Sequence, residues 1–293
     1  MASKLRPSPT AQAFFDALDG REAEGRNQST FVKKRIQTLG WRNRHSQDDL
    51  YPVQIGTNNF SVLQVQRGEI EGTYGTGKCN FFTDINSEPC SDSFACPAAP
   101  STIGATVWPA SMVLMKYLER HPTLVRDKRI VDLGAGTGVT SIAATLLGAD
   151  HCYCTDGEES VVRLSQDNMD RQTLDIVKGR ITTQVYWWGS DTIAEVVGNP
   201  CDVVLVSDCV LPKLYPIAPL VEALDQLLVR PDAVAILSYE HRYFPEYDPK
   251  DKFCELCGAK QLAVRVVPLS EQDPVYSVED IEIWIVSRQA ANE

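Results

Sequence analysis

Beyond residue 105 the chain alternates between short apolar runs and longer segments in which apolar residues recur every three or four positions. Short apolar runs are typical of buried strands, and the longer periodic segments are typical of helices that pack one face on a sheet. Five strands separated by intervening segments are predicted in this way, at 129–133, 151–155, 181–187, 202–207 and 233–238. The alternation predicts an α/β domain built around a mostly parallel sheet.

Two further strands, 262–267 and 280–287, close the pattern, and no segment of helix length lies between them. They are therefore predicted to be antiparallel neighbours. Helices are predicted from Pro109, because proline suits a first helical turn, and between Leu214 and Leu228, where apolar residues follow helical spacing. Five alternating units closed by an antiparallel pair is the order of the class I, Rossmann-like, seven-stranded methyltransferase sheet, and a dinucleotide-binding fold does not end in this way.

The first 55 residues are predicted to be a flexible or partly helical extension, and residues 56–293 to form the domain. Within the extension, residues 11–18 show helical periodicity. Alternation over 60–66 predicts one strand of a hairpin. Residues 72–103 are rich in Gly, Pro, Ser, Asn and Cys, which predicts a loop insertion with one short strand at 78–83.

Composition is ordinary for a soluble globular protein, with 43% hydrophobic and 23% charged residues. No apolar run approaches the ~20 residues that span a bilayer, and the N-terminus lacks the apolar segment of a secretory signal. We therefore expect a cytoplasmic location and no membrane partner. Nine cysteines, several within predicted strands, are typical of reduced thiols. Cys254 and Cys257 have metal-ligand spacing without a second pair, so core packing is favoured and no metal is expected.

The net charge of −11 arises outside the N-terminal segment, since residues 1–50 carry nine basic and six acidic side chains. An acidic domain repels phosphate backbones and attracts basic partners, which disfavours nucleic acid as a partner. Residues 31–45 are basic with aromatic residues between them. A solvated tail is the favoured interpretation, ahead of contact with nucleic acid or an acidic protein.

A glycine-rich loop carries the clearest chemistry. The apolar run 130–133 contains Asp132 and leads into Gly134-Ala135-Gly136-Thr137-Gly138 before a helix. Such a loop lets a ligand approach bare backbone at a helix N-terminus. A dinucleotide fingerprint places its third glycine three residues after the second, but Val139 stands there. With Asp132 available to a ligand's ammonium group, the spacing favours S-adenosyl-L-methionine over NAD.

Asp156 ends the second strand, twenty residues after Gly136. A carboxylate at this place can accept hydrogen bonds from both ribose hydroxyls of an adenosine. The alternative is that Asp156 caps the next helix, which is predicted to begin near Glu158. The two roles are compatible, and the order strand, loop, helix, strand, acid favours the cofactor role.

Several motifs together resemble the family 16 seven-β-strand protein lysine methyltransferases. They are Gly104-Ala105-Thr106-Val107-Trp108-Pro109-Ala110, the glycine loop, Thr155-Asp156, Trp188-Gly189, Val206-Ser207-Asp208 and Tyr239-Glu240-His241-Arg242. The tail from Pro268 to Ile283 looks most like the valosin-containing-protein lysine methyltransferase branch. The resemblance covers roughly 58–70 and 104–288, and it implies a soluble protein substrate such as a chaperone-like ATPase. A monomer is expected.

Carried over residue by residue, the resemblance implies cofactor contacts from seven positions: Trp108, Gly134, Ala135, Gly136, Asp156, Trp188 and Ser207. Asp132 is added to these from its place before the glycine loop. Trp188 can pack against adenine, and Trp108 can wall the pocket near the sulfonium, whose charge an aromatic face tolerates. Core packing is the alternative for each tryptophan. Trp187 is predicted to point away from Trp188 and pack under a helix.

The same resemblance implies that Asp208 is catalytic, because the acid of an Asp-x-x-Tyr motif orients the acceptor amine. Here the motif reads Asp208-Cys209-Val210-Leu211, so leucine replaces the tyrosine. The phenol's role can shift to Tyr215 or Tyr239, the acceptor can change, or turnover can be weak or absent.

Other acceptors and classes have less support in the sequence. The Asn/Asp-Pro-Pro-Tyr motif of many base methyltransferases, the paired-glutamate loop of the main arginine methyltransferases and the metal ligands of catechol-type enzymes are not found. An arginine or histidine acceptor, or a methyltransferase-fold binding protein without turnover, stays open. An oxidoreductase is disfavoured by Val139.

Overall fold

The computed structural model describes residues 40–64, 104–189, 193–198, 201–212, 214–242 and 244–289. The chain divides into two units, Met1–Trp41 and Arg42–Glu293, and every element named below belongs to the second. The helix predicted at 11–18, the insertion at 72–103 and the strand at 78–83 lie outside the described residues.

An antiparallel hairpin opens the second unit. Strand β1 (Leu50–Ile55) pairs with β2 (Asn58–Leu63), which confirms the hairpin predicted from the alternation after residue 60. Strand β1 therefore belongs to the same unit as the main sheet, and the domain boundary near residue 55 stays a prediction. Glu119 of helix α4 (Pro109–Arg120) accepts a hydrogen bond from the turn residue Gly56 over 2.6 Å, which ties the hairpin to the domain.

The main sheet has seven strands in the order β5-β4-β3-β6-β7-β9-β8. Their bounds are β3 Arg129–Leu133, β4 His151–Asp156, β5 Ile181–Val185, β6 Val203–Ser207, β7 Val234–Glu240, β8 Leu262–Val267 and β9 Ile281–Arg288. The first five are parallel, and β9 runs antiparallel to both β7 and β8. This is the strand order of the class I methyltransferase sheet, and it confirms the predicted fold class together with the antiparallel closing pair.

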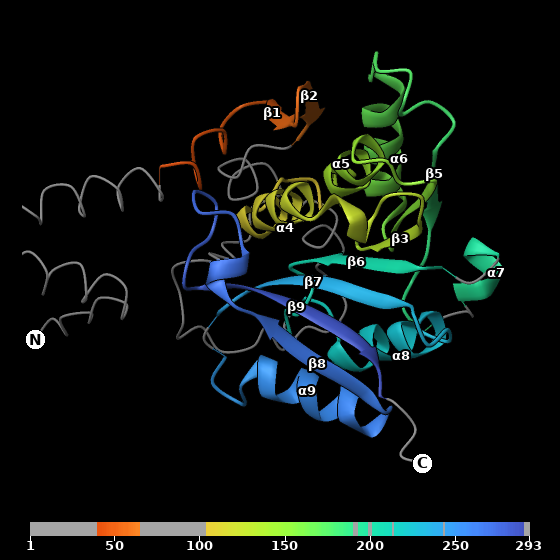
Figure 1. The fold of residues 1–293 in the computed structure, drawn as a ribbon, viewed down its shortest axis with the longest axis vertical. Helices are drawn as coiled ribbons and strands as arrows, with labels where there is room; N and C mark the ends of the chain where they lie inside the picture. The colour runs from red at the N-terminus through yellow and green to blue at the C-terminus, as the bar shows by residue number, and fades with distance from the viewer. Residues whose placement is uncertain are drawn as a thin grey trace, which may run out of the picture. The chain divides into compact units, whose positions relative to one another are not determined.

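Helices cover both faces of the sheet (Figure 1). One face carries α4, α5 (Val139–Leu146) and α6 (Glu159–Asp170), and the other carries α7 (Ile193–Val197), α8 (Ile217–Leu227) and α9 (Pro249–Ala259). Helix α8 begins after Pro216, later than the periodicity from Leu214 predicted, because residue 216 has an extended backbone and serves as the N-cap.

Alternate residues of each strand fill the two cores. Val131 and Leu133 pack with the α7–α8–α9 side, in a cluster that includes Trp284 and Cys257, each fully buried. The packing role predicted for Cys257 is thereby confirmed. Within the described residues, no helix has the length and apolarity to cross a membrane.

Candidate active site

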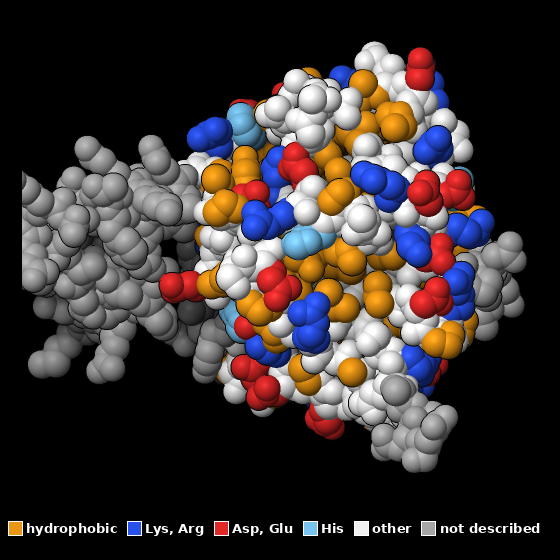
Figure 2. Space-filling model, viewed as in Figure 1, with side chains coloured by type: hydrophobic (Ala, Val, Ile, Leu, Met, Phe, Trp, Pro, Cys, Tyr) orange, Lys and Arg blue, Asp and Glu red, His pale blue; other side chains and the backbone are white. Residues whose placement is uncertain are grey.

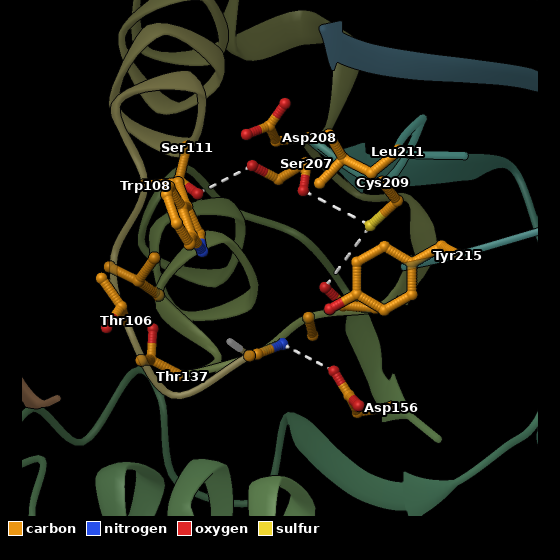
Figure 3. A pocket seen from close by; sticks show the side chains of 15 residues that line it. Thr106, Trp108, Ser111, Thr137, Asp156, Ser207, Asp208, Cys209, Leu211 and Tyr215 are labelled. Carbon is orange, nitrogen blue, oxygen red and sulfur yellow. Dashed lines mark hydrogen bonds between the residues drawn. The ribbon is translucent and has the colours of Figure 1, made fainter. Parts of the chain in front are cut away.

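A pocket opens where the strand order of the sheet reverses. Strands β4 and β6 flank β3, and their carboxyl ends meet at one edge, where ligands bind in open α/β sheets. The pocket draws its walls from the loops after β3, β4 and β6 and from the segment before α4 (Figure 3). Its lining residues are Gly104, Thr106, Trp108, Ser111, Gly134, Ala135, Gly136, Thr137, Val139, Asp156, Ser207, Asp208, Cys209, Leu211 and Tyr215.

The glycine loop takes backbone conformations that side chains rarely allow. Gly134, Gly136 and Gly138 have φ angles of 66°, 58° and 76°. A Cβ added at Gly136 would lie 2.5 Å from the carbonyl oxygen of Gly104, and one added at Gly134 would lie 2.7 Å from the Cys209 sulfur. Bare backbone is therefore required here by close packing as well as by φ.

Asp156 closes one end of the pocket. Its Oδ2 accepts from the Gly136 N–H over 3.1 Å, and its Oδ1 accepts from the Glu158 N–H over 3.2 Å, so it partly caps α6 as well. Burial raises the pKa of Asp156, against these backbone hydrogen bonds that lower it. A carboxylate offers about four lone-pair positions, so room remains for two hydroxyl donors.

Asp132 lies behind the loop instead of in the pocket wall. Its side chain is fully buried, and its Oδ2 accepts from the hydroxyls of Thr140 and Ser141 over 2.6 and 2.8 Å. Its Oδ1 is buried without a hydrogen-bond partner among the described residues. The structure thus leaves one polar atom unsatisfied directly beneath the loop, without bringing Asp132 into contact with the pocket.

Neither of the two adjacent tryptophans lies where it was predicted, and neither lines the pocket. Trp187 is 55% exposed and its ring stands 3.1 Å from where a Cβ on Gly157 would lie, so the prediction that it packs under a helix is wrong. Strand β5 ends at Val185, and the alternation expected to continue through residue 187 stops there. Trp188 is partly buried against Tyr215, with ring centroids 5.8 Å apart, and borders Gly134 behind the pocket wall.

Asp208 and Ser207 form the end of the pocket opposite Asp156 (Figure 3). The Ser207 hydroxyl lies 2.7 Å from that of Ser111 on α4. Asp208 is nearly buried, and it forms a bidentate pair with Arg242 over 2.7 and 2.6 Å. Trp108, the N-cap of α4, walls this end, with the Arg242 guanidinium 6.0 Å from its ring centroid.

The aromatic residues proposed to replace the missing tyrosine are not equivalent. Leu211 lines the pocket beside Asp208 (Figure 3). Tyr215 also lines it, and burial raises the pKa of its phenol far above the usual range. Tyr239 is 2% exposed and packs on Trp284 in the core cluster, away from the pocket lining, so it is not placed to stand in.

The pocket offers neither a thiolate nor a metal centre within the described residues. Cys209 lines it, but burial raises the pKa of this thiol well above the ordinary value and keeps it protonated. In the same part of the chain, no group of three His, Cys, Asp or Glu side chains is arranged to hold a metal ion.

Sequence reasoning missed Thr106, Ser111 and Thr137 as lining residues, and gave Arg242 no role. Hydroxyl residues in a loop or helix carry no distinctive pattern. Arg242 had a usable signal, since it follows β7 as Asp208 follows β6, and neighbouring parallel strands bring their carboxyl ends together.

A family model described as lysine methyltransferase matches residues 98–257, which is more than half of the chain. This chain belongs to the lysine methyltransferase family. The membership agrees with the resemblance seen in the sequence motifs. The narrower resemblance, to the valosin-containing-protein branch, stays a prediction.

Several curated members of this family are similar to the chain. The protein-lysine N-methyltransferase EFM3 of Chaetomium thermophilum is 30% identical over 185 residues, 57% of this chain and 50% of that protein. Protein-lysine methyltransferase METTL21E of Mus musculus is 32% identical over 170 residues, 55% of this chain and 66% of that protein. The chain thus matches between half and about two thirds of the length of these relatives.

Among solved structures, the glycopeptide N-methyltransferase MtfA superposes with a TM-score of 0.47 at 13% identity, covering 61% of this chain and 90% of that chain. The strand order described above defines the fold independently of this superposition.

The pocket of this lysine methyltransferase family member fits the chemistry of S-adenosyl-L-methionine. That molecule carries two ribose hydroxyls, which match the remaining acceptor positions of Asp156. Its cationic sulfur suits an aromatic face such as that of Trp108. Gly134, Ala135 and Gly136 line the pocket, and at the two glycines the close approach of Cys209 and Gly104 leaves no space for a Cβ.

Proposed function

We propose that this chain is an S-adenosyl-L-methionine-dependent protein-lysine N-methyltransferase. The observation that carries the proposal is one pocket with a glycine loop and Asp156 at one end and Asp208 with Trp108 at the other. Family membership supports the lysine acceptor. The first end suits an adenosine, and the second end suits an amine that must be oriented.

The residues of the chain would divide the work along the pocket. Asp156 would bind the ribose, and the backbone of Gly134–Gly136 would lie along the methionine part of the cofactor. Trp108 and Ser207 would border the end where the methyl group is transferred. The cofactor would supply a methyl group on a positively charged sulfur. Trp188 would pack against Gly134 on the side away from the pocket. Asp132 would hold its unpartnered Oδ1 below the loop, outside the pocket lining.

Asp208 would orient the acceptor at the reacting end. An amine attacks a methyl carbon only after losing its proton and only along the line of the breaking bond. A fixed carboxylate can hold one N–H of the amine in that direction, and Asp208 itself is buried at this end of the pocket. Ser111, whose hydroxyl lies 2.7 Å from that of Ser207, lines the pocket at the same end.

We infer a protein substrate in the cytoplasm, with a chaperone-like ATPase as the first candidate by family resemblance, and a monomeric enzyme. Free cysteines at Cys152, Cys154, Cys201, Cys209 and Cys257 support a reducing compartment. The net charge of −11 supports a basic acceptor segment over nucleic acid.

A second candidate is a methyltransferase-fold protein that binds cofactor with weak or no turnover, or one that methylates arginine or histidine. Leu211 favours it, because leucine offers no hydrogen bond beside Asp208 where the family has a phenol.

Calorimetry with S-adenosyl-L-methionine tests the proposal at its base. We expect one mole bound per chain, and Asp156→Ala should weaken binding by about 1.5–3 kcal/mol, because hydrogen bonds to a charged group are lost. Asp175→Ala removes an exposed carboxylate far from the pocket lining and should leave affinity unchanged. Wild-type protein that binds no cofactor would contradict the proposal.

A further inference from the structure

A bidentate ion pair joins the motifs that follow β6 and β7. Arg242 Nη1 donates to Asp208 Oδ1 over 2.7 Å, and Nη2 donates to Oδ2 over 2.6 Å. The Asp208 side chain is only 2% exposed, whereas that of Arg242 is 30% exposed. A planar guanidinium bound through two parallel hydrogen bonds fixes the orientation of a carboxylate as well as its position.

The backbone around this pair is equally constrained. Asp208 has a φ of 59°, a left-handed conformation that non-glycine residues adopt rarely and only where the surroundings hold it. Its N–H donates to the Ser238 carbonyl over 2.9 Å, and the Glu240 N–H donates to Asp208 Oδ1 over 3.3 Å. Both the main chain and the side chain of Asp208 are therefore tied to the end of β7.

The hydrogen bonds leave one acceptor position open. Oδ1 of Asp208 accepts from Arg242 and from the Glu240 backbone, whereas Oδ2 accepts from Arg242 alone among the described residues. A carboxylate offers about two lone-pair positions on each oxygen. The open position is thus on Oδ2, at the end of the pocket that Trp108 walls.

The charges around the Asp208–Arg242 pair favour binding of a cationic group. Glu240 Oε2 pairs with Arg242 over 3.2 Å, its Oε1 pairs with Arg42 over 2.5 Å, and Arg42 also pairs with Asp280 over 2.7 Å. Three carboxylates and two guanidinium groups leave one negative charge in this network. An incoming lysine ammonium would balance it, and a neutral or anionic group would not.

We propose that Arg242 is a positioning residue, which holds the Asp208 carboxylate so that one Oδ2 lone pair faces the acceptor amine. This deepens the proposed lysine methylation and rests on it. Asp208 then accepts a hydrogen bond from the amine and orients it, while its charge stays shared with Arg242. Arg242→Lys would keep the positive charge but lose the two parallel hydrogen bonds of the guanidinium group. It would therefore hold the Asp208 carboxylate less well than arginine does.

Kinetics of four variants test the proposal: Arg242→Gln, Arg242→Lys, Asp208→Asn and the double variant Asp208→Asn/Arg242→Gln. Arg242→Gln should lower kcat by about 10- to 100-fold, the scale of losing alignment at a reacting centre. The cofactor Kd, measured by calorimetry, should stay within about twofold, since Arg242 does not line the cofactor end of the pocket. Arg242→Lys should fall between wild type and Arg242→Gln.

The double variant separates positioning from folding. If Arg242 acts through Asp208, adding Arg242→Gln to Asp208→Asn should cause no further loss of kcat. The comparison of Asp208→Asn with the double variant can still be made if Arg242→Gln alone folds poorly. The double variant leaves no buried carboxylate without a partner. Arg230→Gln is the matched control: Arg230 pairs with Asp232 and Asp202 at the opposite end of β6, and its loss should leave kcat unchanged.

The outcomes are distinguishable. An active wild type in which Arg242→Gln keeps kcat, or in which the two losses multiply, would overturn the role of Arg242 and leave the proposed function standing. A wild type that binds cofactor and methylates no lysine would overturn the proposed function, and this inference with it.

Discussion

Asp132 is a buried carboxylate whose surroundings satisfy only one of its two oxygens. Oδ2 accepts from two hydroxyls of α5, while Oδ1 has no partner in the described part of the chain. Burial raises the pKa of Asp132 to about 6, partly offset by the hydrogen bonds from Thr140 and Ser141. The folded protein therefore holds this proton more tightly than the unfolded chain does.

Stability should consequently fall as pH rises from about 4 to about 6, because ionisation of Asp132 costs the folded state more than the unfolded state. Asp132→Asn should remove this part of the pH dependence. At pH 7 the cofactor-free variant should be more stable by about 3 kcal/mol, since the pKa of Asp132 rises from 3.8 to about 6 and one pKa unit corresponds to about 1.4 kcal/mol. Urea unfolding of both proteins between pH 4.5 and 7.5 measures the difference, and parallel curves would contradict the assignment.

Leu211 gives a second prediction for a single residue. A tyrosine at position 211 would place a hydroxyl beside Asp208, where it can accept a second N–H of the amine. Leu211→Tyr should therefore raise lysine methylation several-fold, and Tyr215→Phe, which alters a pocket-lining phenol, should lower it. Tyr239→Phe is the control, because Tyr239 lies in the core cluster. Equal rates for Leu211→Tyr and wild type would show that position 211 does not shape acceptor geometry.

The loop between β3 and α5 provides a prediction for an element. Gly136→Ala would introduce a Cβ 2.5 Å from the Gly104 carbonyl oxygen, in addition to the strain of a φ of 58°. Gly56 has the same φ of 58°, and nothing lies within 4 Å of a Cβ added there. Gly56→Ala therefore measures the cost in stability of the backbone strain alone. We expect a cost of about 1 kcal/mol for Gly56→Ala and clearly more for Gly136→Ala.

Cofactor titrations of the two alanine variants complete this comparison. Gly136→Ala should weaken cofactor binding because Gly136 lines the pocket and donates its N–H to Asp156. Gly56→Ala should not, since it lies in the hairpin turn. The same affinity in both variants would mean that the loop adapts to a side chain.

Elements with strong periodicity were predictable, and those without it were not. The seven strands, the parallel core and the antiparallel end follow from apolar runs separated by lengths that do or do not accommodate a helix. The short hairpin strand Leu50–Ile55 was missed because it includes Pro52, although its burial alternates regularly. Proline at a strand position is a signal against a strand unless the strand lies at an edge.

Site residues fixed by backbone geometry were also predictable, whereas those fixed by tertiary packing were not. The glycine loop and Asp156, which were expected from their spacing to contact the cofactor, line one pocket, and their contact with the cofactor stays a prediction. Trp187 and Trp188 were assigned opposite directions on the expectation that the strand continues through residue 187, but β5 ends at Val185. The Arg242–Asp208 pair joins residues 34 positions apart, and only the register of β6 against β7 brings them together.

At the scale of the molecule, charge supports a protein substrate. Figure 2 shows acidic and basic side chains interspersed over the visible face of the described residues, without a continuous basic surface there. The net charge of −11 would repel a nucleic acid and attract a basic protein segment. An ammonium group would also balance the residual negative charge around Asp208.

The most direct test of the central claim follows the methyl group into its acceptor. S-adenosyl-L-methionine labelled on its methyl group is incubated with a lysate from cells that lack this protein, together with the wild type or Asp208→Asn. The expected result is label in protein, recovered after hydrolysis as methyl-lysine, with far less label for Asp208→Asn. Label confined to RNA or small molecules, or recovered in arginine or histidine, would contradict lysine methylation by this chain.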